Sequence, residues 1–332
     1  MCIKKDDSRT PNDTKAGSES HFILRLFWTL FNISVMGVLS GFVSPYWWAF
    51  EVLSSFRAQY AFYIGLGFIF AIMNKRTIMA LFCSVLFVFN SYTLIPYYFF
   101  NETELNFSGR LKISGINVHT ANKRFDLVLQ YINEKKPDIV LLTEISLEWL
   151  NNLKPLEKEY PYFISKPQLD NFGIALFSKI PPKKLEIFYF VPELPSVLMS
   201  FLAASETVTL IGTHLLPPRN YDYSIGRNLQ MEKITTFLTQ IEGKKILTGD
   251  LNTPPWVDRF QKLLLESKMK DSSLGRGIQP TWPTNSWWLF GIPIDHCLVS
   301  PDFKIISRVV GPYVGSDHYP VYVELGIPEK PR

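Results

Sequence analysis

Cysteine is scarce in this sequence, and several common site motifs are missing from it. The three cysteines, Cys2, Cys83 and Cys297, have no paired spacing, which excludes a Cys-x-x-Cys zinc site, and only one lies in the polar part, so no disulfide forms within it. There is also no His-Glu-x-x-His motif, which argues against a zinc hydrolase of that type. The net charge of +4 selects no particular partner.

Charge is nearly absent from residues 21–100. This segment has five charged side chains but 23 aromatic ones, almost half of the aromatic residues in the chain. From residue 101 onward, 26 basic and 25 acidic residues give the mixed pattern of a water-soluble globular domain. This composition excludes a disordered chain, a collagen-like chain and a wholly soluble chain.

Three apolar runs in the first hundred residues predict membrane-spanning helices. Residues 22–43 are long enough to cross a hydrocarbon core of about 30 Å. Residues 58–73 form a shorter run behind Arg57, and residues 77–100 form a third. No small-residue cleavage site follows the first run, which argues against a signal peptide. A buried helical subdomain is the alternative interpretation.

Basic residues set the expected orientation of these helices. Lysines and arginines precede the first run, and Lys75 and Arg76 separate the second run from the third, so the positive-inside rule keeps the N-terminus cytoplasmic. With three spans the polar domain emerges in the periplasm or outside the cell. With two spans, if Arg57 prevents the second crossing, the domain is cytoplasmic. We expect a multi-pass protein of the cell membrane with the lipid bilayer as a partner.

Composition divides the chain into four segments. We expect a disordered N-terminal tail over residues 1–20, because this segment is polar and shows no periodicity. The membrane region covers residues 21–100 and a linker covers residues 101–108. The remaining segment, residues 109–328, is the expected catalytic domain.

Two strand-helix-strand units are predicted in the polar segment. They lie at residues 111–117, 122–136 and 138–144, and at residues 208–214, 225–241 and 245–252. This alternation is typical of an α/β fold, in which strand ends border the crevice that binds ligands. The polar residues that follow apolar strands are Asn117, Glu144, His214, Asp250, Asn252, Asp295, Asp317 and His318. Taken singly, each has an ordinary interpretation as a turn or cap residue.

Taken together, these motifs resemble the endonuclease/exonuclease/phosphatase family, or DNase I-like fold, over residues 109–326. The motifs are, in family order, GINVH, LLTE, GTHL, TGDLN, IDH and GSDHYPV. The resemblance implies a four-layered α/β sandwich. The preceding apolar segment and the TWP motif at residues 281–283 resemble the membrane-attached bacterial branch, in which transmembrane helices precede the catalytic domain.

The resemblance implies hydrolysis of a phosphate ester with a divalent cation, Mg²⁺ or Mn²⁺. Glu144 is the expected metal ligand, with Asn117 and Asp317 as direct or water-mediated partners, because these cations prefer oxygen ligands. Asp250 is expected to orient or deprotonate the attacking water. Asn252 is expected to donate a hydrogen bond to a phosphate oxygen.

Two histidines are also implied as catalytic residues. His318 is expected to contact the phosphate, as a base or by its charge, while Asp295 holds its other ring nitrogen. His214 is expected to act as a general acid or to bind phosphate from the other side. Its carboxylate partner is not evident, although Asp170 is a candidate. We expect the other two histidines of this segment, His119 and His296, to be structural.

The substrate is the least determined feature. The near-neutral catalytic segment does not favour a long nucleic acid as partner, although short contacts with DNA remain open. Trp282 could form an apolar wall for a lipid or a sugar. Arg227 and Asn228 could bind a phosphate or a head group. For all three residues, an ordinary position on the protein surface is an equally good interpretation.

We expect a membrane-anchored phosphodiesterase acting on a lipid, envelope-associated or nucleic-acid ester. An envelope-exposed DNase-type endonuclease and a catalytically silent membrane scaffold are the alternatives. No protein partner is predicted.

Overall fold

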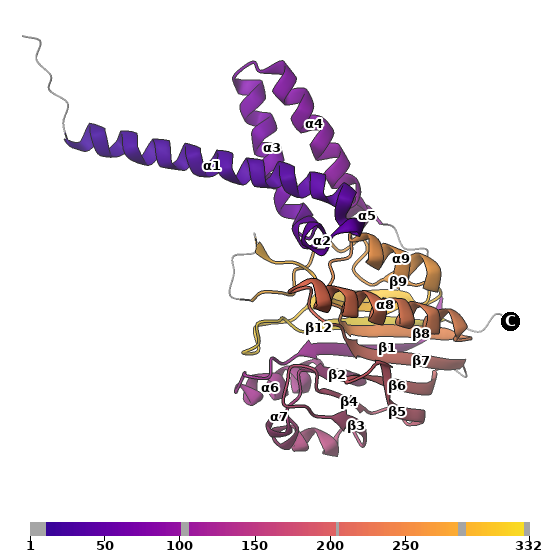
Figure 1. Ribbon diagram of the computed structural model, residues 1–332. Helices are drawn as coiled ribbons and strands as arrows, with labels where there is room; N and C mark the ends of the chain where they lie inside the picture. The colour runs from indigo at the N-terminus through magenta and orange to yellow at the C-terminus, as the bar shows by residue number, and fades with distance from the viewer. Residues whose placement is uncertain (1–10, 101–105, 204–205, 285–289, 329–332) are drawn as a thin grey trace, which may run out of the picture.

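The computed structural model describes residues 11–100, 106–203, 206–284 and 290–328. An N-terminal helical region is followed by an α/β domain (Figure 1). The helical region consists of α1 (Pro11–Val43), the 3-10 turn η1 (Ser44–Tyr46), α2 (Trp48–Ser54), α3 (Arg57–Met73), α4 (Thr77–Tyr92) and α5 (Ile95–Phe99).

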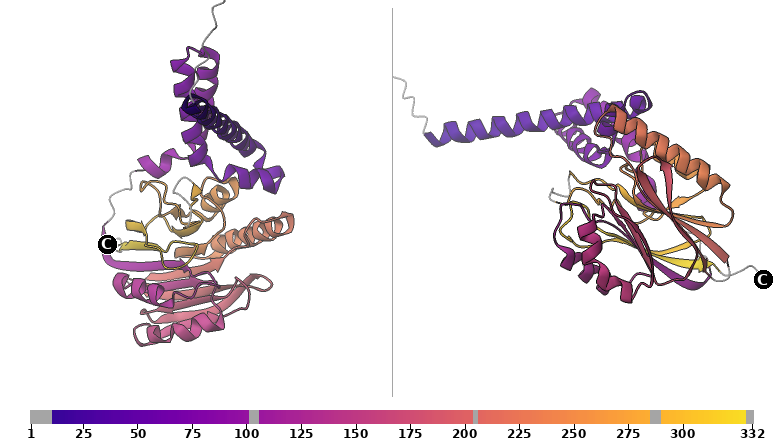
Figure 2. Two further views of the ribbon diagram at one scale, coloured as in Figure 1. Left: turned by 90° about the vertical axis from the view of Figure 1, so that its left-hand side faces the viewer. Right: turned by 60° about the horizontal axis from the view of Figure 1, so that its bottom comes forward.

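The α3–α4 hairpin and α1 pack on one another through a small apolar core. Its buried members are Phe31, Val38, Tyr60, Ile64, Cys83 and Leu86. The C-terminal end of α1, the start of α3 and the end of α4 lie next to the α/β domain (Figures 1 and 2). The turn between α3 and α4 and the N-terminal half of α1 point away from this domain.

The length of these helices limits the number of membrane crossings. Residues His21–Val43 of α1 are long and apolar enough to span a bilayer. Helices α2 and α3 meet at 63° and make a second candidate only if the bent pair is one span. Helix α4 has 16 residues, fewer than a span usually needs. The described residues therefore contain one or two such helices, compared with the three that were expected.

Helix α1 begins eleven residues earlier than the apolar run, at Pro11. Residues 11–20, which we expected to belong to a disordered tail, are helical in the structure. Once the apolar segment has formed a helix, polar residues can extend it at little cost, and proline is tolerated at the first position because its missing N–H is not needed there. The earlier part of the expected tail, residues 1–10, lies outside the described residues.

The α/β domain contains two six-stranded sheets. The first has the order β11-β12-β1-β2-β4-β3 and the second β5-β6-β7-β8-β10-β9. The strands of the first sheet are β1 (Phe107–Asn117), β2 (Ile139–Thr143), β3 (Tyr162–Lys166), β4 (Ile174–Ser178), β11 (Lys304–Val310) and β12 (Val321–Pro328). Those of the second are β5 (Pro182–Val191), β6 (Leu194–Ala203), β7 (Glu206–His214), β8 (Lys244–Asp250), β9 (Lys270–Asp271) and β10 (Asp295–Val299).

Helices cover the outer face of each sheet. The helices and helical turns of this domain are α6 (Phe125–Lys135), α7 (Leu147–Asn152), η2 (Lys154–Lys158), α8 (Tyr221–Gln240) and α9 (Asp258–Ser267). Side chains such as Leu141 and Val197 fill the space between the two sheets. Tyr131 and Trp149 of α6 and α7 pack with the outer face of the first sheet, and Ile234 of α8 packs with that of the second. The expected four-layered α/β sandwich is confirmed.

Both predicted strand-helix-strand units are present, and each joins two parallel strands. In the first unit, β1 and β2 are parallel and pair Asn117 with Thr143, so Glu144 follows directly. In the second, β7 and β8 are parallel and pair His214 with Asp250. Strand β10 pairs antiparallel with β8 and places Asp295 beside Asp250. The register thus brings the polar strand ends together.

Gly249 is a position where the fold requires glycine. Its φ of +138° is one that other residues rarely adopt, and a Cβ there would lie 1.9 Å from the carbonyl oxygen of Thr213 on the neighbouring strand. We expect Gly249→Ala to lower the free energy of unfolding by about 3 kcal/mol. Denaturant unfolding of the full chain in detergent measures this. Gly109→Ala, whose Cβ would meet only Ile327 at 3.4 Å, is the control. Equal stability of the two variants would contradict the prediction.

Candidate active site

The carboxylate of Asp250 lies at the centre of the converging strand ends. Its Oδ2 accepts a hydrogen bond from Asn117 Nδ2 at 3.1 Å, and its Oδ1 accepts one from the backbone N–H of Asn252 at 2.9 Å. Oδ2 also lies 3.4 Å from Nε2 of His214 and 3.7 Å from Nε2 of His318. Burial alone would raise the pKa of Asp250, but these neighbouring histidines lower it to about 2. Asp250 is therefore ionised at neutral pH.

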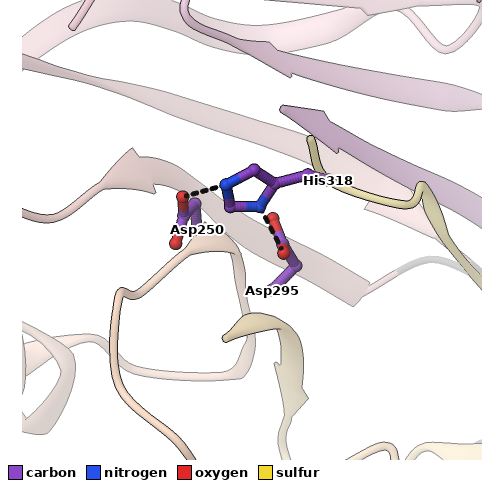
Figure 3. A group of neighbouring side chains, drawn as sticks. All are labelled: Asp250, Asp295 and His318. Carbon is purple, nitrogen blue, oxygen red and sulfur yellow. Dashed lines mark hydrogen bonds and ion pairs between the residues drawn. The ribbon is translucent and has the colours of Figure 1, made fainter. Parts of the chain in front are cut away.

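The ring of His318 lies between two carboxylates, as Figure 3 shows. Its Nδ1 donates a hydrogen bond to Asp295 Oδ2 at 2.9 Å, while Nε2 faces Asp250. Burial opposes protonation of this ring, but the negative charges of Asp295 and Asp250 outweigh it and raise the pKa of His318 to about 10. A pKa of about 10 makes His318 an imidazolium at neutral pH, and Asp295 binds its Nδ1.

His214 approaches Asp250 from the end of β7. Burial lowers the pKa of His214, but the hydrogen bond and charge of Asp250 more than offset this and raise it above the usual value. The carboxylate beside His214 Nε2 is thus Asp250, whereas Asp170 accepts a hydrogen bond from the N–H of Phe172. Asn252 Nδ2 lies 3.3 Å from the same ring nitrogen. His214, Asp250 and Asn252 are therefore close enough to interact with the same phosphate group.

Glu144 and Asn117 form a second polar pair beside Asp250. Asn117 Nδ2 donates to Glu144 Oε1 at 3.0 Å, and the backbone N–H of Thr120 donates to Glu144 Oε2 at 3.1 Å. The backbone of Glu144 has a φ of +63°, an unfavourable conformation for a residue with a side chain. Thr120 was not anticipated from the sequence, because nothing in its local pattern points to Glu144.

Asp317 lies at the edge of the site and is partly exposed. Its Oδ2 accepts a hydrogen bond from Trp282 Nε1 at 3.2 Å, and its Oδ1 is 3.8 Å from His119 Nδ1. Among the described residues, no hydrogen-bond partner reaches Oδ1 of Asp317. Asp317 and His119 both line the cavity described below, so the histidine that we expected to be structural borders the site.

Two sets of side chains could bind a metal ion. Ligand atoms of Asp250, Asp295 and His318 lie within 4.8 Å of one another. However, Nδ1 of His318 already binds Asp295, and an imidazole nitrogen suits a hard divalent cation less well than a carboxylate oxygen does. Glu144 and Asp317 offer carboxylate oxygens on the same cavity, which suits a hard divalent cation. We therefore favour the second set.

A cavity of about 560 Å³ opens above these groups. Its polar wall contains the side chains His119, Glu144, His214, Asp250, Asn252, Asp317 and His318. Trp282, which we expected to contact the substrate, also lines it. The volume is within the range of cavities that bind small molecules, about 300–1,000 Å³.

Two expected substrate-binding residues and one histidine do not line this cavity. Arg227 is buried and its Nη2 contacts Glu51 Oε1 of α2 at 2.5 Å and Asn228 Oδ1 at 2.9 Å. Neither Arg227 nor Asn228 is among the residues that line the cavity. His296 is buried, with Nε2 3.0 Å from the carbonyl oxygen of Thr253, and it does not line the cavity.

The raised pKa of His318 predicts a pH-dependent contribution to stability. Protonation of His318 stabilises the fold fully below pH 6.5, its unfolded value, and this contribution is lost as the pH rises through about 10. Without divalent cations, we expect His318→Gln to lower Tm more at pH 6.5 than at about pH 10. His296→Gln is the control, because burial lowers the pKa of His296 instead of raising it. A Tm difference for His318→Gln that does not change with pH would contradict the prediction.

Comparisons with known proteins identify the family of the α/β domain. A model described as "Endonuclease/Exonuclease/phosphatase family" matches residues 114–318. No curated protein matches the chain. Three similar solved structures are TDP2 from D. rerio in complex with a single-strand DNA product, an endonuclease/exonuclease/phosphatase from Beutenbergia cavernae and a family protein from Bacteroides thetaiotaomicron.

The structural similarity concerns the α/β domain. Each of the three is 17% identical to this chain, with TM-scores of 0.55, 0.54 and 0.54 respectively. The alignments cover 66%, 67% and 66% of this chain and 100%, 72% and 98% of the other chains. At this identity the likeness shows a shared fold. Because the family match covers more than half of the chain, the protein belongs to the endonuclease/exonuclease/phosphatase family and is a hydrolase of phosphate esters.

Proposed function

We propose that this protein is a membrane-anchored, divalent-metal-dependent phosphodiesterase acting on a lipid, envelope-associated or nucleic-acid ester. One observation carries the proposal: Asp250, His318, His214, Asn252 and Glu144 line one cavity, in which neighbouring charges lower the pKa of Asp250 and raise that of His318. This arrangement combines a group that can orient water with several that can stabilise negative charge on phosphate oxygens.

The pKa of Asp250 favours one of its two expected roles. A carboxylate with a pKa of about 2 is a weak base, so we assign it the orientation of the attacking water by accepting a hydrogen bond. His318 and Asn252 stabilise the charge that develops on the phosphate oxygens. We assign His214, whose pKa is raised by Asp250, the donation of a proton to the leaving oxygen.

Glu144 would hold the divalent cation, with Asn117 and Asp317 as direct or water-mediated partners. The bound cation supplies positive charge next to the phosphate oxygens. The ligand atoms are carboxylate and amide oxygens, which favours Mg²⁺ or Mn²⁺ over zinc. Asn117 Nδ2 donates to both Glu144 and Asp250, so it also holds the proposed metal ligand and the water-orienting residue in a fixed relation.

The helical region supports the membrane part of the proposal. Large apolar side chains are exposed along α1, α3 and α4, and soluble proteins rarely expose so much apolar surface. Lys75 and Arg76 lie at the turn that points away from the α/β domain, and Arg25 lies on the distant half of α1 (Figure 1). If α1, the bent α2–α3 pair and the short α4 each cross the bilayer with these basic residues in the cytoplasm, the catalytic domain lies in the periplasm or outside the cell.

Two substitutions test the proposed chemistry. We expect Asp250→Asn and His318→Ala each to lower kcat for bis(p-nitrophenyl) phosphate by about a thousandfold in the presence of Mg²⁺. Asp302→Asn is the control, because Asp302 binds Lys244 at the opposite end of β8. The same variants should lose any nicking of plasmid DNA. Activity that survives both substitutions, or that is insensitive to chelation of the metal, would contradict the proposal.

A labelling experiment tests the proposed orientation. In intact cells we expect a thiol introduced as Lys75→Cys to be protected from a membrane-impermeant maleimide. A thiol introduced as Asp126→Cys, at an exposed site on α6, should react. The native Cys83 and Cys297 are buried and provide little background. Protection at position 126 would place the catalytic domain in the cytoplasm and contradict the proposed orientation.

A further inference from the structure

The helical region forms part of the cavity wall. Val52 of α2 and Ser55 and Phe56, which connect α2 to α3, line the same cavity as Asp250 and His318. They lie more than 150 positions before these catalytic residues in the sequence. The α/β domain alone therefore does not supply the complete binding surface.

Buried contacts fix this wall in place. Glu51 on α2 binds Arg227 on α8 at 2.5 Å, and both side chains are almost fully buried. Gln59 Nε2 donates to the carbonyl oxygen of Gly291 at 2.9 Å. On the other side of the turn, Trp256 Nε1 donates to the carbonyl oxygen of Ser55 at 3.0 Å. A buried ion pair is costly unless its geometry is well defined, so these contacts specify one docked arrangement.

The chemistry of the cavity suits a ligand with one phosphate and an apolar part. Its non-polar lining includes Val52, Phe56, Phe172, Pro217, Tyr223 and Ile292. Among the described residues that line it, Arg219 is the single lysine or arginine. A nucleic acid usually binds through several such contacts along its backbone, whereas one phosphate needs few.

Exposed apolar side chains lie immediately before α2 and along α8. Tyr46 and Trp47, immediately before α2, are 85% and 50% exposed. Aromatic residues at such positions are typical of a membrane interface. Tyr221, Ile225 and Leu229 are exposed at intervals of four along α8, the helix whose Arg227 binds Glu51. A bilayer around the helical region would thus meet the α/β domain close to the cavity.

We propose that the substrate is a membrane lipid with a phosphodiester head group, and that Val52 and Phe56 bind its apolar part. The phosphate lies against Asp250 and His318, and the adjoining acyl portion lies against the wall that α2 provides. This inference rests on the proposed phosphodiesterase activity and narrows its substrate class. It also gives the helical region a role in recognition in addition to anchoring.

Substrate selectivity of wall variants tests this inference. The full chain in detergent micelles with Mg²⁺ is assayed on phosphatidylcholine, phosphatidylethanolamine, phosphatidylglycerol and sphingomyelin, and on the water-soluble bis(p-nitrophenyl) phosphate. We expect Val52→Asn and Phe56→Ala to lower the ratio of kcat/KM for the lipid to that for the soluble diester by about tenfold, mainly through KM, because apolar contact area is lost. Leu53→Ala, on the same helix but outside the cavity lining, should keep the ratio.

The outcomes separate this inference from the proposed function. Hydrolysis of the soluble diester but of none of the lipids by the native protein would overturn the lipid substrate and leave the phosphodiesterase intact. A higher kcat/KM for plasmid DNA than for every lipid would overturn it too. If Val52→Asn lowered kcat/KM equally for the lipid and for the soluble diester, with Tm unchanged, the wall would have only a structural role. Failure of the native protein to hydrolyse any of these esters would overturn both proposals.

Discussion

The buried, ionised carboxylate of Asp250 is the constraint on which the site depends. Burying a charge is costly unless hydrogen bonds and opposite charges compensate it. For Asp250 the compensating groups are Asn117 from the first sheet, His214 from the second, and His318 from the loop before β12. Because these partners come from both sheets, the charge is compensated only when the sandwich is correctly assembled. Of these partners, His214 and His318 also face the phosphate in the proposed reaction.

A second buried charge connects the catalytic domain to the helical region. Arg227 Nη2 binds Glu51 on α2, while Nη1 of the same guanidinium lies 3.4 Å from the carbonyl oxygen of Asn252. The side chain of Arg227 therefore both binds α2 and contacts the backbone of Asn252. Burial lowers the pKa of Arg227, but the neighbouring Glu51 favours its charged form. The helical region and the segment around Asn252 are thus parts of one packed unit.

The sequence predicted the strands and helices of the α/β domain better than it predicted contacts between distant residues. Apolar strands ending in polar residues are a local signal, so Asn117, His214 and Asp250 could be placed at strand ends before the structure was known. The contact between Glu51 and Arg227 spans 176 positions, and no local pattern reveals it. Arg227 therefore looked like a residue able to bind phosphate. Likewise, the polar composition of residues 11–20 suggested disorder, because composition does not show that the neighbouring apolar helix extends into them.

Attack of water on phosphorus, with Asp250 orienting the water, is the central claim of this account. It is tested most directly by hydrolysing bis(p-nitrophenyl) phosphate with the full chain and Mg²⁺ in water enriched in the heavy isotope of oxygen. Mass spectrometry of the products locates the isotope. The account predicts a single heavy oxygen in p-nitrophenyl phosphate and none in p-nitrophenol. Isotope in p-nitrophenol, or p-nitrophenyl phosphate that carries none, would contradict it.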